Sequence, residues 1–252
     1  MWNAEEYNTG SLLQNTLNDR YLPYCEAIFR DKHIDIGCGN GRTTQFMAKN
    51  NPSTNFIGID ADTNMIAFAK QNYPLDNIEY IAKLAENISE AADSVTSFMC
   101  WHWISDIESL ARKVFKLLSL DGYLFIMVPN VTASVSNIFD LLAHAQRCIV
   151  PDAKLSPLPY RREHRVYCNT LLKAGFTIET EVHHTTPFAL PSIGHYIDFI
   201  KSLSLIDDAC NTVEKAKIYD IFQRDCLQYM EKYHEGAICH PDTFSIILAK
   251  KR

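Results

Sequence analysis

The sequence predicts an α/β fold: a doubly wound, mostly parallel sheet of seven strands, the last one antiparallel, with helical cap insertions. Residues 32–128 alternate short apolar runs with helical patterns, which is typical of right-handed βαβ units. The runs are four to seven residues long and mostly apolar, as expected of strands covered on both faces. The chain has 252 residues, enough for one large domain with a sizeable core.

The first half of the chain supplies the regular βα alternation. Strands are expected at 33–37, 55–60, 78–82, 95–99 and 123–129, and helices at 43–50, 63–72 and 107–118. Each helical segment repeats its apolar residues with a helical period, and each strand segment is a compact apolar run. These segments predict the parallel part of the sheet.

The pattern changes after Pro129. A helix is expected within 166–176, ended by Gly175, because glycine favours the left-handed position after a helix. Strands are expected at 177–186 and 243–251, and residues 192–234 are mostly helical. We interpret 1–252 as a single domain. Segments 130–165 and 187–240 are expected to form a cap on the substrate side, and 1–24 an N-terminal lid.

Composition and charge narrow the class of protein. The net charge is −6 and no dense Lys/Arg run occurs, which argues against nucleic acid as a partner. Eight scattered cysteines form no CxxC pair, a pattern typical of reduced thiols in the cytosol. No apolar run reaches the roughly 18 residues of a membrane span, and the polar N-terminus does not resemble a secretory signal. We therefore expect a cytoplasmic protein without a membrane partner.

The stretch "HIDIGCGNGRTT" (33–44) predicts a ligand-binding turn between a strand and a helix. Gly37, Gly39 and Gly41 allow the backbone to approach a ligand closely, and the helix start after them offers free amides. Asp60 ends the second strand, 19 residues after Gly41. A carboxylate at that place can accept hydrogen bonds from two ribose hydroxyls. A tight turn with a helix-capping aspartate is the alternative, but the two features together favour a nucleotide-like ligand.

The spacing GxGxG, with Asp35 two residues before it, resembles the first motif of class I S-adenosylmethionine-dependent methyltransferases. The resemblance implies that the turn wraps the methionine part of S-adenosyl-L-methionine, that Asp60 holds the ribose, and that Asp35 orients loop amides or a water near the ammonium group. The residues it implies for cofactor binding are Asp35, Gly37, Cys38, Gly39, Gly41, Asp60, Ala61, Met65, Ala85 and Cys100. A nicotinamide dehydrogenase would fit the fold, but the glycine spacing disfavours it.

Two further stretches, "LLSLDGYLFIMVPN" (117–130) and "LLKAGF" (171–176), resemble the later helices and strands of the same Rossmann-like superfamily. The chain departs from it at Leu84, where the family often has an acidic residue near the adenine. One interpretation is that the Ala85 amide still donates a hydrogen bond to the adenine. The other is a weakened cofactor site, or a non-catalytic S-adenosylmethionine-binding protein that acts by interaction.

Two aromatic stretches, "WNAEEYNTGSLLQ" (2–14) and "SFMCWHWISD" (97–106), are similar to juvenile-hormone-acid and trans-aconitate methyltransferases. The resemblance implies O-methylation of a small-molecule carboxylate. It implies that Tyr7 and Gln14 belong to a segment that closes over the site, and that Trp101, His102 and Trp103 line it. Gln14, Trp101 and His102 are the candidate catalytic residues, and one of the two tryptophans is expected to face the core. Malonyl-carrier-protein methyltransferases remain an alternative, with an acyl-carrier protein as partner.

A carboxylate substrate should also meet a cation. "YRREHR" (160–165) supplies Arg161, Arg162 and Arg165, although a solvated helix start explains them equally well. His183 and His184 lack a third ligand at a recognisable spacing, so no metal is expected. The sequence does not identify the acid or the oligomeric state.

Overall fold

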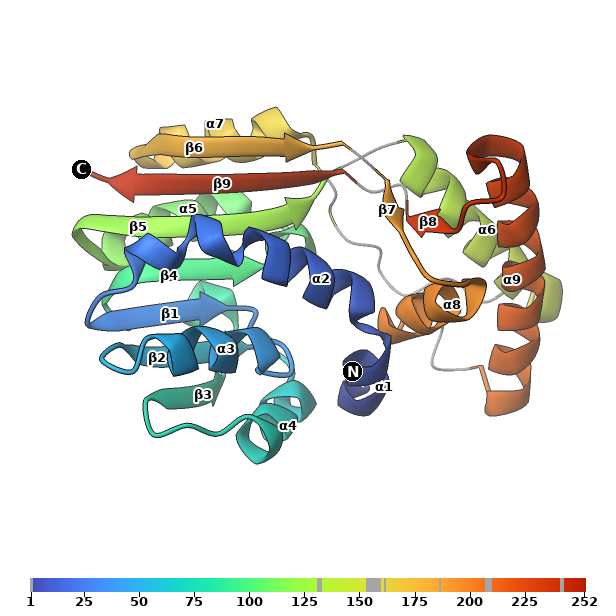
Figure 1. Cartoon of the computed structure of the whole chain (residues 1–252), viewed down its shortest axis with the longest axis horizontal. Helices are drawn as coiled ribbons and strands as arrows, with labels where there is room; N and C mark the ends of the chain where they lie inside the picture. Colours follow the sequence, from blue (N-terminus) through green and yellow to red (C-terminus); the bar gives the residue numbers. More distant parts are fainter. Residues whose placement is uncertain are drawn as a thin grey trace.

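The computed structural model describes residues 2–130, 133–152, 160, 162–185, 187–206, 210–240 and 243–252, with the side chains of 133–137 left out. Figure 1 shows a sheet with helices on both faces, and a group of helices beyond one end of its strands. The strands are β1 (Lys32–Ile36), β2 (Asn55–Asp60), β3 (Ile78–Ala82), β4 (Ala92–Phe98), β5 (Leu118–Pro129), β6 (Phe176–His184), β7 (Phe188–Ala189), β8 (Cys239–His240) and β9 (Phe244–Lys251). The α-helices are α1 (Ala4–Gly10), α2 (Leu12–Tyr21), α3 (Arg42–Asn50), α4 (Thr63–Asn72), α5 (Ile107–Leu117), α6 (Ala133–Ile149), α7 (His164–Ala174), α8 (Ile193–Ser202) and α9 (Thr212–His234).

Seven strands form one sheet in the order β3-β2-β1-β4-β5-β9-β6. Strands β1 to β5 pair in parallel, and β9 pairs antiparallel with both β5 and β6. The predicted doubly wound sheet with an antiparallel last strand is therefore confirmed. The order reverses at β1 and β4, and this switch point is where open α/β sheets bind ligands.

Each face of the sheet is covered by its own set of helices. Side chains of one face pack with α2 and α3, through residues such as Leu17 and Met47. Those of the other face pack with α5 and α7, through residues such as Val114 and Leu171. In Figure 1, α2 and α3 lie in front of the sheet and α5 and α7 behind it. As the sequence predicts, α7 ends at Gly175, whose φ of 107° is left-handed.

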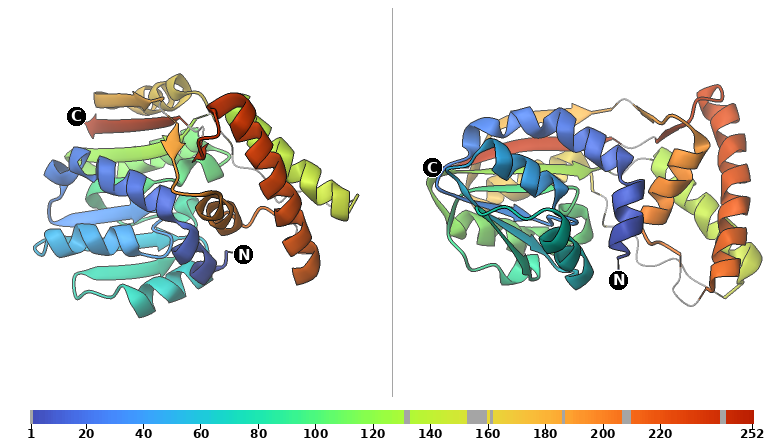
Figure 2. Two further views of the ribbon diagram at one scale, coloured as in Figure 1. Left: turned by 45° about the vertical axis from the view of Figure 1, so that its right-hand side comes forward. Right: turned by 60° about the horizontal axis from the view of Figure 1, so that its bottom comes forward.

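The cap consists of α6, α8, α9 and the short β7–β8 pair, which lie beyond the ends of β4 and β5 (Figures 1 and 2). Its buried residues, among them Phe199 and Phe222, continue the core that covers the α2 face of the sheet. Cap and sheet thus share one core, which keeps the cap close to the strand ends. In the described part of the chain, no helix has both the length and the apolar character needed to cross a membrane.

Part of the N-terminal segment packs into the main core of the domain, which the sequence does not suggest. Leu13 and Leu17 on α2 are fully buried in the main core, so this helix belongs to the body of the domain. The hydroxyl of Tyr21 forms a 2.8 Å hydrogen bond with His184 Nδ1 at the end of β6. The expected lid over 1–24 therefore narrows to residues 2–10, that is, α1 and the residues before it. Leu13, Leu17 and Tyr21 follow one another at intervals of four residues, so they share one face of α2.

Candidate active site

The glycine turn follows β1 at the carboxyl edge of the sheet. Gly37, Gly39 and Gly41 all have left-handed φ values, of 74°, 54° and 88°. The backbone N–H groups of Gly37 and Cys38 both donate to the carbonyl of Ile59, at 2.7 and 3.0 Å, which closes the turn against β2. A Cβ atom at Gly37 would overlap the side chain of Cys100 after β4. Only glycine therefore lets these two loops meet here.

Two members of the turn serve the packing beneath it. A Cβ at Gly41 would lie 2.7 Å from Ala69 Cβ and 2.9 Å from the hydroxyl of Tyr80. The Cys38 side chain is buried in the same small cluster with Ala69 and Tyr80. Neither Gly41 nor Cys38 lines the pocket described below. Their assignment as cofactor contacts is corrected: they let α3 and α4 pack closely behind the turn.

Asp60 stands at the end of β2 with its carboxylate beside the turn. It accepts hydrogen bonds from the backbone N–H of Gly39 and of Asp62, both at 2.9 Å. Burial raises the pKa of Asp60, although these two backbone donors oppose that rise. The carboxylate thus fixes the turn and still borders the pocket, and its remaining lone pairs can accept further hydrogen bonds.

Asp35 is buried below the turn and does not line the pocket. It accepts hydrogen bonds from the hydroxyls of Thr44, at 2.6 Å, and Thr96, at 2.9 Å. Burial raises the pKa of Asp35 to about 6. The carboxylate thus binds the first turn of α3 to β4, and its expected role in orienting loop amides or a water near the ammonium group stays a prediction.

His33 belongs to the same buried network. Its ring lies 2.8 Å from the hydroxyls of both Ser94 and Thr96. Because the Thr96 hydroxyl donates to Asp35, it must accept from His33 Nε2, and Ser94 then donates to Nδ1. Burial lowers the pKa of His33 to about 3, so the ring is neutral. His33 is thus a core histidine with both ring nitrogens hydrogen-bonded.

A pocket of about 430 Å³ opens between the strand ends, α1 and the cap. Its lining on the β1–β4 side is Ile36, Gly37, Gly39, Ile59, Asp60, Ala61, Asp62, Met65, Lys83, Leu84, Ala85, Glu86 and Cys100. Its lining toward the cap and the N-terminus is Trp2, Tyr7, Gln14, Phe98, Met99, His102, Trp103, Ile104, Pro129, Phe139, Phe199, Leu203 and Leu205. Seven of the ten expected cofactor residues are among them, all but Asp35, Cys38 and Gly41.

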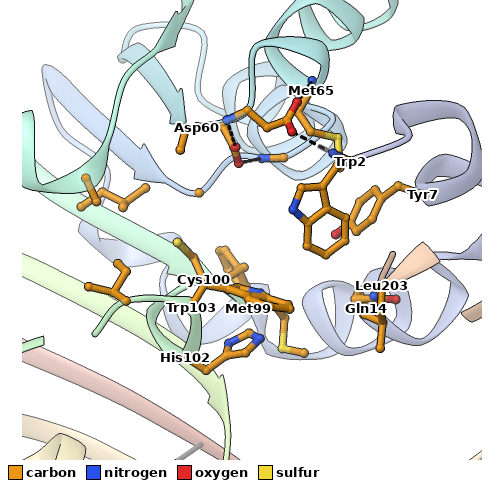
Figure 3. A pocket seen from close by; sticks show the side chains of 18 of the residues that line it. Trp2, Tyr7, Gln14, Asp60, Met65, Met99, Cys100, His102, Trp103 and Leu203 are labelled. Carbon is orange, nitrogen blue, oxygen red and sulfur yellow. Dashed lines mark hydrogen bonds between the residues drawn. The ribbon is translucent and has the colours of Figure 1, made fainter. Parts of the chain in front are cut away.

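The N-terminus closes one side of the pocket. The backbone N–H of Trp2 donates to Asp62 Oδ2 at 2.8 Å. The Trp2 ring makes edge-to-face contacts with Tyr7 and with Trp103, at centroid distances of 5.6 and 5.5 Å. Figure 3 shows Trp2 and Tyr7 on one side of the space, with Met99 and His102 on the other. Burial, followed by the nearby Asp60, raises the pKa of Tyr7, so its hydroxyl is neutral.

The Trp-His-Trp stretch forms a 3-10 turn, Trp101–Trp103, after the end of β4. Trp103 and His102 line the pocket, and His102 is 5% exposed. Trp101 is fully buried in the core between the sheet, α5 and α7, and does not reach the pocket. The catalytic assignment of Trp101 is therefore corrected, whereas one tryptophan facing the core agrees with the expectation. Gln14, the third candidate, lines the pocket from α2.

Neither Arg162 nor Arg165 lines the pocket. The Arg162 guanidinium donates to the carbonyls of Tyr160, Ile104 and Ser105, at 2.8 to 2.9 Å, and so holds two loops together. Arg165 pairs with Glu163 at 2.6 Å on the surface. Arg161 lies outside the described residues. Arg165 thus agrees with the alternative of a solvated helix start, whereas Arg162 has a structural role.

Several lining residues escaped the sequence reasoning. Trp2 and Asp62 were missed, although Asp62 also caps α4 by accepting from the N–H groups of Asn64 and Met65. Glu86 was also missed, although it lies only two residues after Leu84, the position expected to border the adenine. It is an acidic residue close to that position that lines the pocket. Among the apolar cap residues, Phe139, Leu203 and Leu205 carry no motif, since only the tertiary fold brings α6, α8 and the residues after α8 to the strand ends.

A comparison with protein families identifies the region that carries this site. A family model described as "Methyltransferase domain" matches residues 34–126, which hold the glycine turn, Asp60 and His102. This segment is identified as a methyltransferase domain.

Curated relatives of this methyltransferase domain include enzymes with different acceptors. The chain is 29% identical over 124 residues to a malonyl-[acyl-carrier protein] O-methyltransferase of Bacillus anthracis, covering 48% of this chain and 44% of the relative. It is 30% identical over 99 residues to a trans-aconitate 2-methyltransferase of Variovorax paradoxus, covering 38% of each. A juvenile hormone acid O-methyltransferase of Bombyx mori is 23% identical over 247 residues, covering 79% of this chain and 87% of the relative. The matches with the first curated relatives span half of their length or less, 38–48%.

Solved structures show the same fold around the domain. A phosphoethanolamine N-methyltransferase 2 of Haemonchus contortus, solved with S-adenosyl-L-methionine, superposes with a TM-score of 0.59 at 16% identity. The match covers 92% of this chain and 52% of that one. A methyltransferase from Mesorhizobium loti superposes with a TM-score of 0.52 at 16% identity, covering 92% and 97%. At these identities the superpositions establish the fold of the methyltransferase domain and its cap.

Proposed function

We propose that this protein transfers a methyl group from S-adenosyl-L-methionine to the carboxylate of a small, largely apolar acid. The observation that carries the proposal is the division of one pocket into a polar half at β1–β4 and an apolar half under the cap. The family match supports the cofactor, and the names of three relatives support a carboxylate acceptor.

The residues on the β1–β4 side fit the cofactor. An ideal Cβ at Gly39 would have only the Tyr7 ring within 4 Å, so the backbone is open toward the pocket. Asp60 offers a carboxylate to the two ribose hydroxyls beside it. Ala85 and the half-exposed Leu84 border the place beyond β3 where the adenine would lie. S-adenosylmethionine, when bound, supplies an electrophilic methyl group on a sulfonium centre.

The cap side of the pocket suits an apolar acceptor. Phe139, Phe199, Leu203 and Leu205 converge there with Met99. Burying an apolar chain against such side chains contributes about 0.8 kcal/mol per CH₂ group. Lys83 is the cation among the described lining residues. It lies on the β1–β4 side of the pocket, away from the cap, and forms an ion pair with Glu90. A tricarboxylate would therefore find little compensation for its extra charges here.

Neutral donors can hold the reacting carboxylate. Gln14 is 4% exposed, and its Oε1 has no hydrogen-bond partner among the described residues. Because the side-chain amide can turn by 180°, Gln14 can present either its oxygen or its NH₂ group to a ligand. His102, on the same side of the pocket, offers a ring N–H. A carboxylate is ionised at pH 7, so these residues need only align it and no general base is required.

The aromatic wall completes the chemistry by excluding water. The Trp2 ring contacts both Tyr7 and Trp103, and all three side chains line the pocket (Figure 3). A dry pocket strengthens the electrostatic interactions inside it and protects the transferred group from hydrolysis. The N-terminal residues thus act as a lid that closes over both ligands.

A radiolabelled methyl-transfer assay over a panel of acids tests the proposal. Dodecanoic acid and shorter saturated acids represent the apolar class, and trans-aconitate represents the polycarboxylate class. We expect methyl esters of the apolar acids and at least tenfold lower kcat/KM for trans-aconitate. Cofactor binding by calorimetry without any methyl ester from the panel would instead support a non-catalytic binding protein.

Malonyl-acyl carrier protein is a second candidate acceptor. It is favoured by the match to malonyl-[acyl-carrier protein] O-methyltransferases over residues of the domain. Its malonyl group also ends in a carboxylate, and the carrier would dock outside the pocket. The same assay with malonyl-acyl carrier protein and with free acids separates the two candidate acceptors. Methylation of the carrier-bound malonyl group alone would favour the carrier protein, and methylation of free acids would favour a small-molecule acceptor.

A further inference from the structure

We propose that His164, Cys168 and Glu181 form a binding site for a zinc-type divalent metal ion, separate from the methyl-transfer pocket. His164 and Cys168 lie one turn apart on α7, so their side chains share a helix face. Glu181 projects toward them from β6, the edge strand of the sheet. None of the three lines the pocket.

The ligand atoms already have the spacing of a coordination shell. His164 Nε2 lies 3.4 Å from Glu181 Oε2 and 3.5 Å from Cys168 Sγ. Cys168 Sγ lies 3.2 Å from Glu181 Oε2. Around a tetrahedral Zn²⁺ with ordinary bond lengths, N, S and O ligands are about 3.3–3.6 Å apart. The three donors therefore match three corners of such a site with little movement.

A second layer of hydrogen bonds orients the histidine. His164 Nδ1 lies 2.7 Å from Ser245 Oγ, and the Ser245 hydroxyl donates to Asn130 Oδ1 at 2.6 Å. Because Ser245 has a single hydroxyl hydrogen, its oxygen must accept from Nδ1–H. The lone pair of Nε2 then faces Cys168 and Glu181, which is the tautomer that a metal requires.

The donor types favour Zn²⁺ over the hard cations. Zn²⁺ and other divalent first-row transition metals bind a set of one sulfur, one imidazole nitrogen and one carboxylate oxygen, whereas Mg²⁺ and Ca²⁺ prefer oxygen ligands. Glu181 is solvent-exposed, which gives an ion a path to the site and leaves the fourth position to water. Without a metal, the Cys168 thiol donates to Glu181. On metal binding this proton passes to solvent as the thiolate coordinates the ion.

The site would join parts of the fold that border the pocket. Ser245 is on β9, and its partner Asn130 directly follows Pro129, a lining residue. Two residues before His164, Arg162 holds the carbonyl of Ile104, which also lines the pocket. A bound ion would thus fix the start of α7 to β6 and stabilise the native state over the unfolded one.

The test is a titration of the full chain, reduced and freed of metal, with Co²⁺ alone as a spectroscopic probe for the zinc site. We expect one equivalent to give the visible bands of a tetrahedral site together with a thiolate-to-cobalt charge-transfer band, and Zn²⁺ to displace it. Cys168→Ser should remove the charge-transfer band. Glu181→Gln, at an exposed position, should weaken binding at least tenfold. Ser245→Ala should weaken it about 10- to 100-fold, as loss of an orienting partner does elsewhere.

The chain offers a matched control on α6. Cys148 Sγ lies 3.7 Å from His144 Nε2, also one helical turn apart, and these two belong to no three-residue cluster among the described residues. Cys148→Ser should leave the cobalt spectrum and affinity unchanged. The proposal is overturned if the wild type shows no thiolate band, if Cys168→Ser keeps it, or if Cys148→Ser removes it. Unchanged affinity in a folded Glu181→Gln variant would also overturn it.

Discussion

The backbone N–H of Trp2 donates a hydrogen bond to the carboxylate of Asp62, at 2.8 Å, and so ties the N-terminus to the loop after β2. The other oxygen of Asp62 accepts from the first amides of α4. The Asp62 carboxylate thus joins the N-terminal lid to the loop between β2 and α4, which directly follows Asp60. This contact places the Trp2 ring between Tyr7 and Trp103, so closure of the lid and occupation of the pocket are expected to be coupled.

Trp2→Ala should weaken binding of S-adenosylhomocysteine and reduce turnover. The substitution removes two edge-to-face contacts, each contributing roughly 0.5–1.5 kcal/mol. If the lid orders fully on the ligand, the affinity falls by about 5- to 100-fold. Calorimetry measures the change. Leu12→Ala, a partly exposed neighbour on α2 that does not line the pocket, is the control, and equal affinities in both variants would contradict a lid.

Asp60→Asn should weaken cofactor binding. The amide keeps the shape of the side chain but loses the charge that accepts from Gly39 and from the ribose hydroxyls. Hydrogen bonds to a charged group contribute about 1.5–3 kcal/mol each, so we expect at least a tenfold loss of S-adenosylhomocysteine affinity.

Asp93→Asn is the matched control for that experiment. Asp93 also accepts from a backbone amide, that of Lys32, but it stands at the opposite ends of the strands. Its replacement should leave cofactor affinity unchanged, even if the protein loses some stability. The assignment of the ribose to Asp60 fails if both variants bind equally well.

Leu84→Asp should strengthen cofactor binding by about 2- to 10-fold. Leu84 lines the pocket at the position where the resemblance to class I methyltransferases implies an acidic side chain, and it is 54% exposed. A carboxylate there could accept from the adenine amino group, with a gain limited by solvent to about 0.5–1.5 kcal/mol. Calorimetry with S-adenosylhomocysteine checks the direction, and a weaker complex in a folded variant would indicate a different placement of the adenine.

The sequence predicts the sheet almost completely, because apolar runs buried on both faces are distinctive. It also predicts the turn and Asp60, since their chemistry is local. It fails at Trp101: β4 ends at Phe98, Met99 has a left-handed φ of 54°, and a 3-10 turn follows. This irregular backbone, which no local signal announces, directs His102 and Trp103 into the pocket and Trp101 into the core.

The hydrogen-bond partners of Asp35 and Arg162 could not be predicted for another reason. A carboxylate just before a glycine turn is consistent with a ligand contact or with a buried anchor, and only the positions of Thr44 and Thr96 decide between them. Likewise, Arg162 finds backbone carbonyls of a loop 57 and 58 residues earlier in the chain. Such long-range hydrogen bonds are set by tertiary packing and have no periodic pattern.

Asp35→Asn should remove a specific pH dependence of stability. The pKa of Asp35 is raised to about 6 in the folded state, against 3.8 for the free side chain. The folded protein therefore binds this proton more tightly, and the contribution of Asp35 to stability is largest below pH 4 and decreases as the pH rises to 6. The loss is on the order of 3 kcal/mol.

The measurement for Asp35 is the free energy of unfolding by urea at several pH values between 4 and 7.5. His33 opposes the trend, because its lowered pKa makes stability rise with pH over the window from about 3 to 6.5. Subtracting the Asp35→Asn curve from that of the wild type cancels this common contribution. The difference should fall as the pH rises, and a constant difference would show that Asp35 is ionised throughout.

His102→Ala should reduce turnover by about 10- to 1000-fold while leaving cofactor affinity nearly unchanged. The ring lies on the cap side of the pocket, away from Asp60 and the glycine turn, so its loss would misalign the acceptor rather than the cofactor (Figure 3). His102→Gln should recover part of the activity, because its amide can still donate a hydrogen bond to a carboxylate.

The decisive measurement for His102 is the pH dependence of kcat with an apolar acid as substrate. A carboxylate acceptor is ionised from pH 6 to 9, so wild-type turnover should be flat over that range. If instead turnover rises through one ionisation between pH 6 and 7, and His102→Ala loses both the rise and the activity, His102 acts as a general base. The acceptor would then be a group that must lose a proton, such as a hydroxyl, and the carboxylate proposal would be wrong.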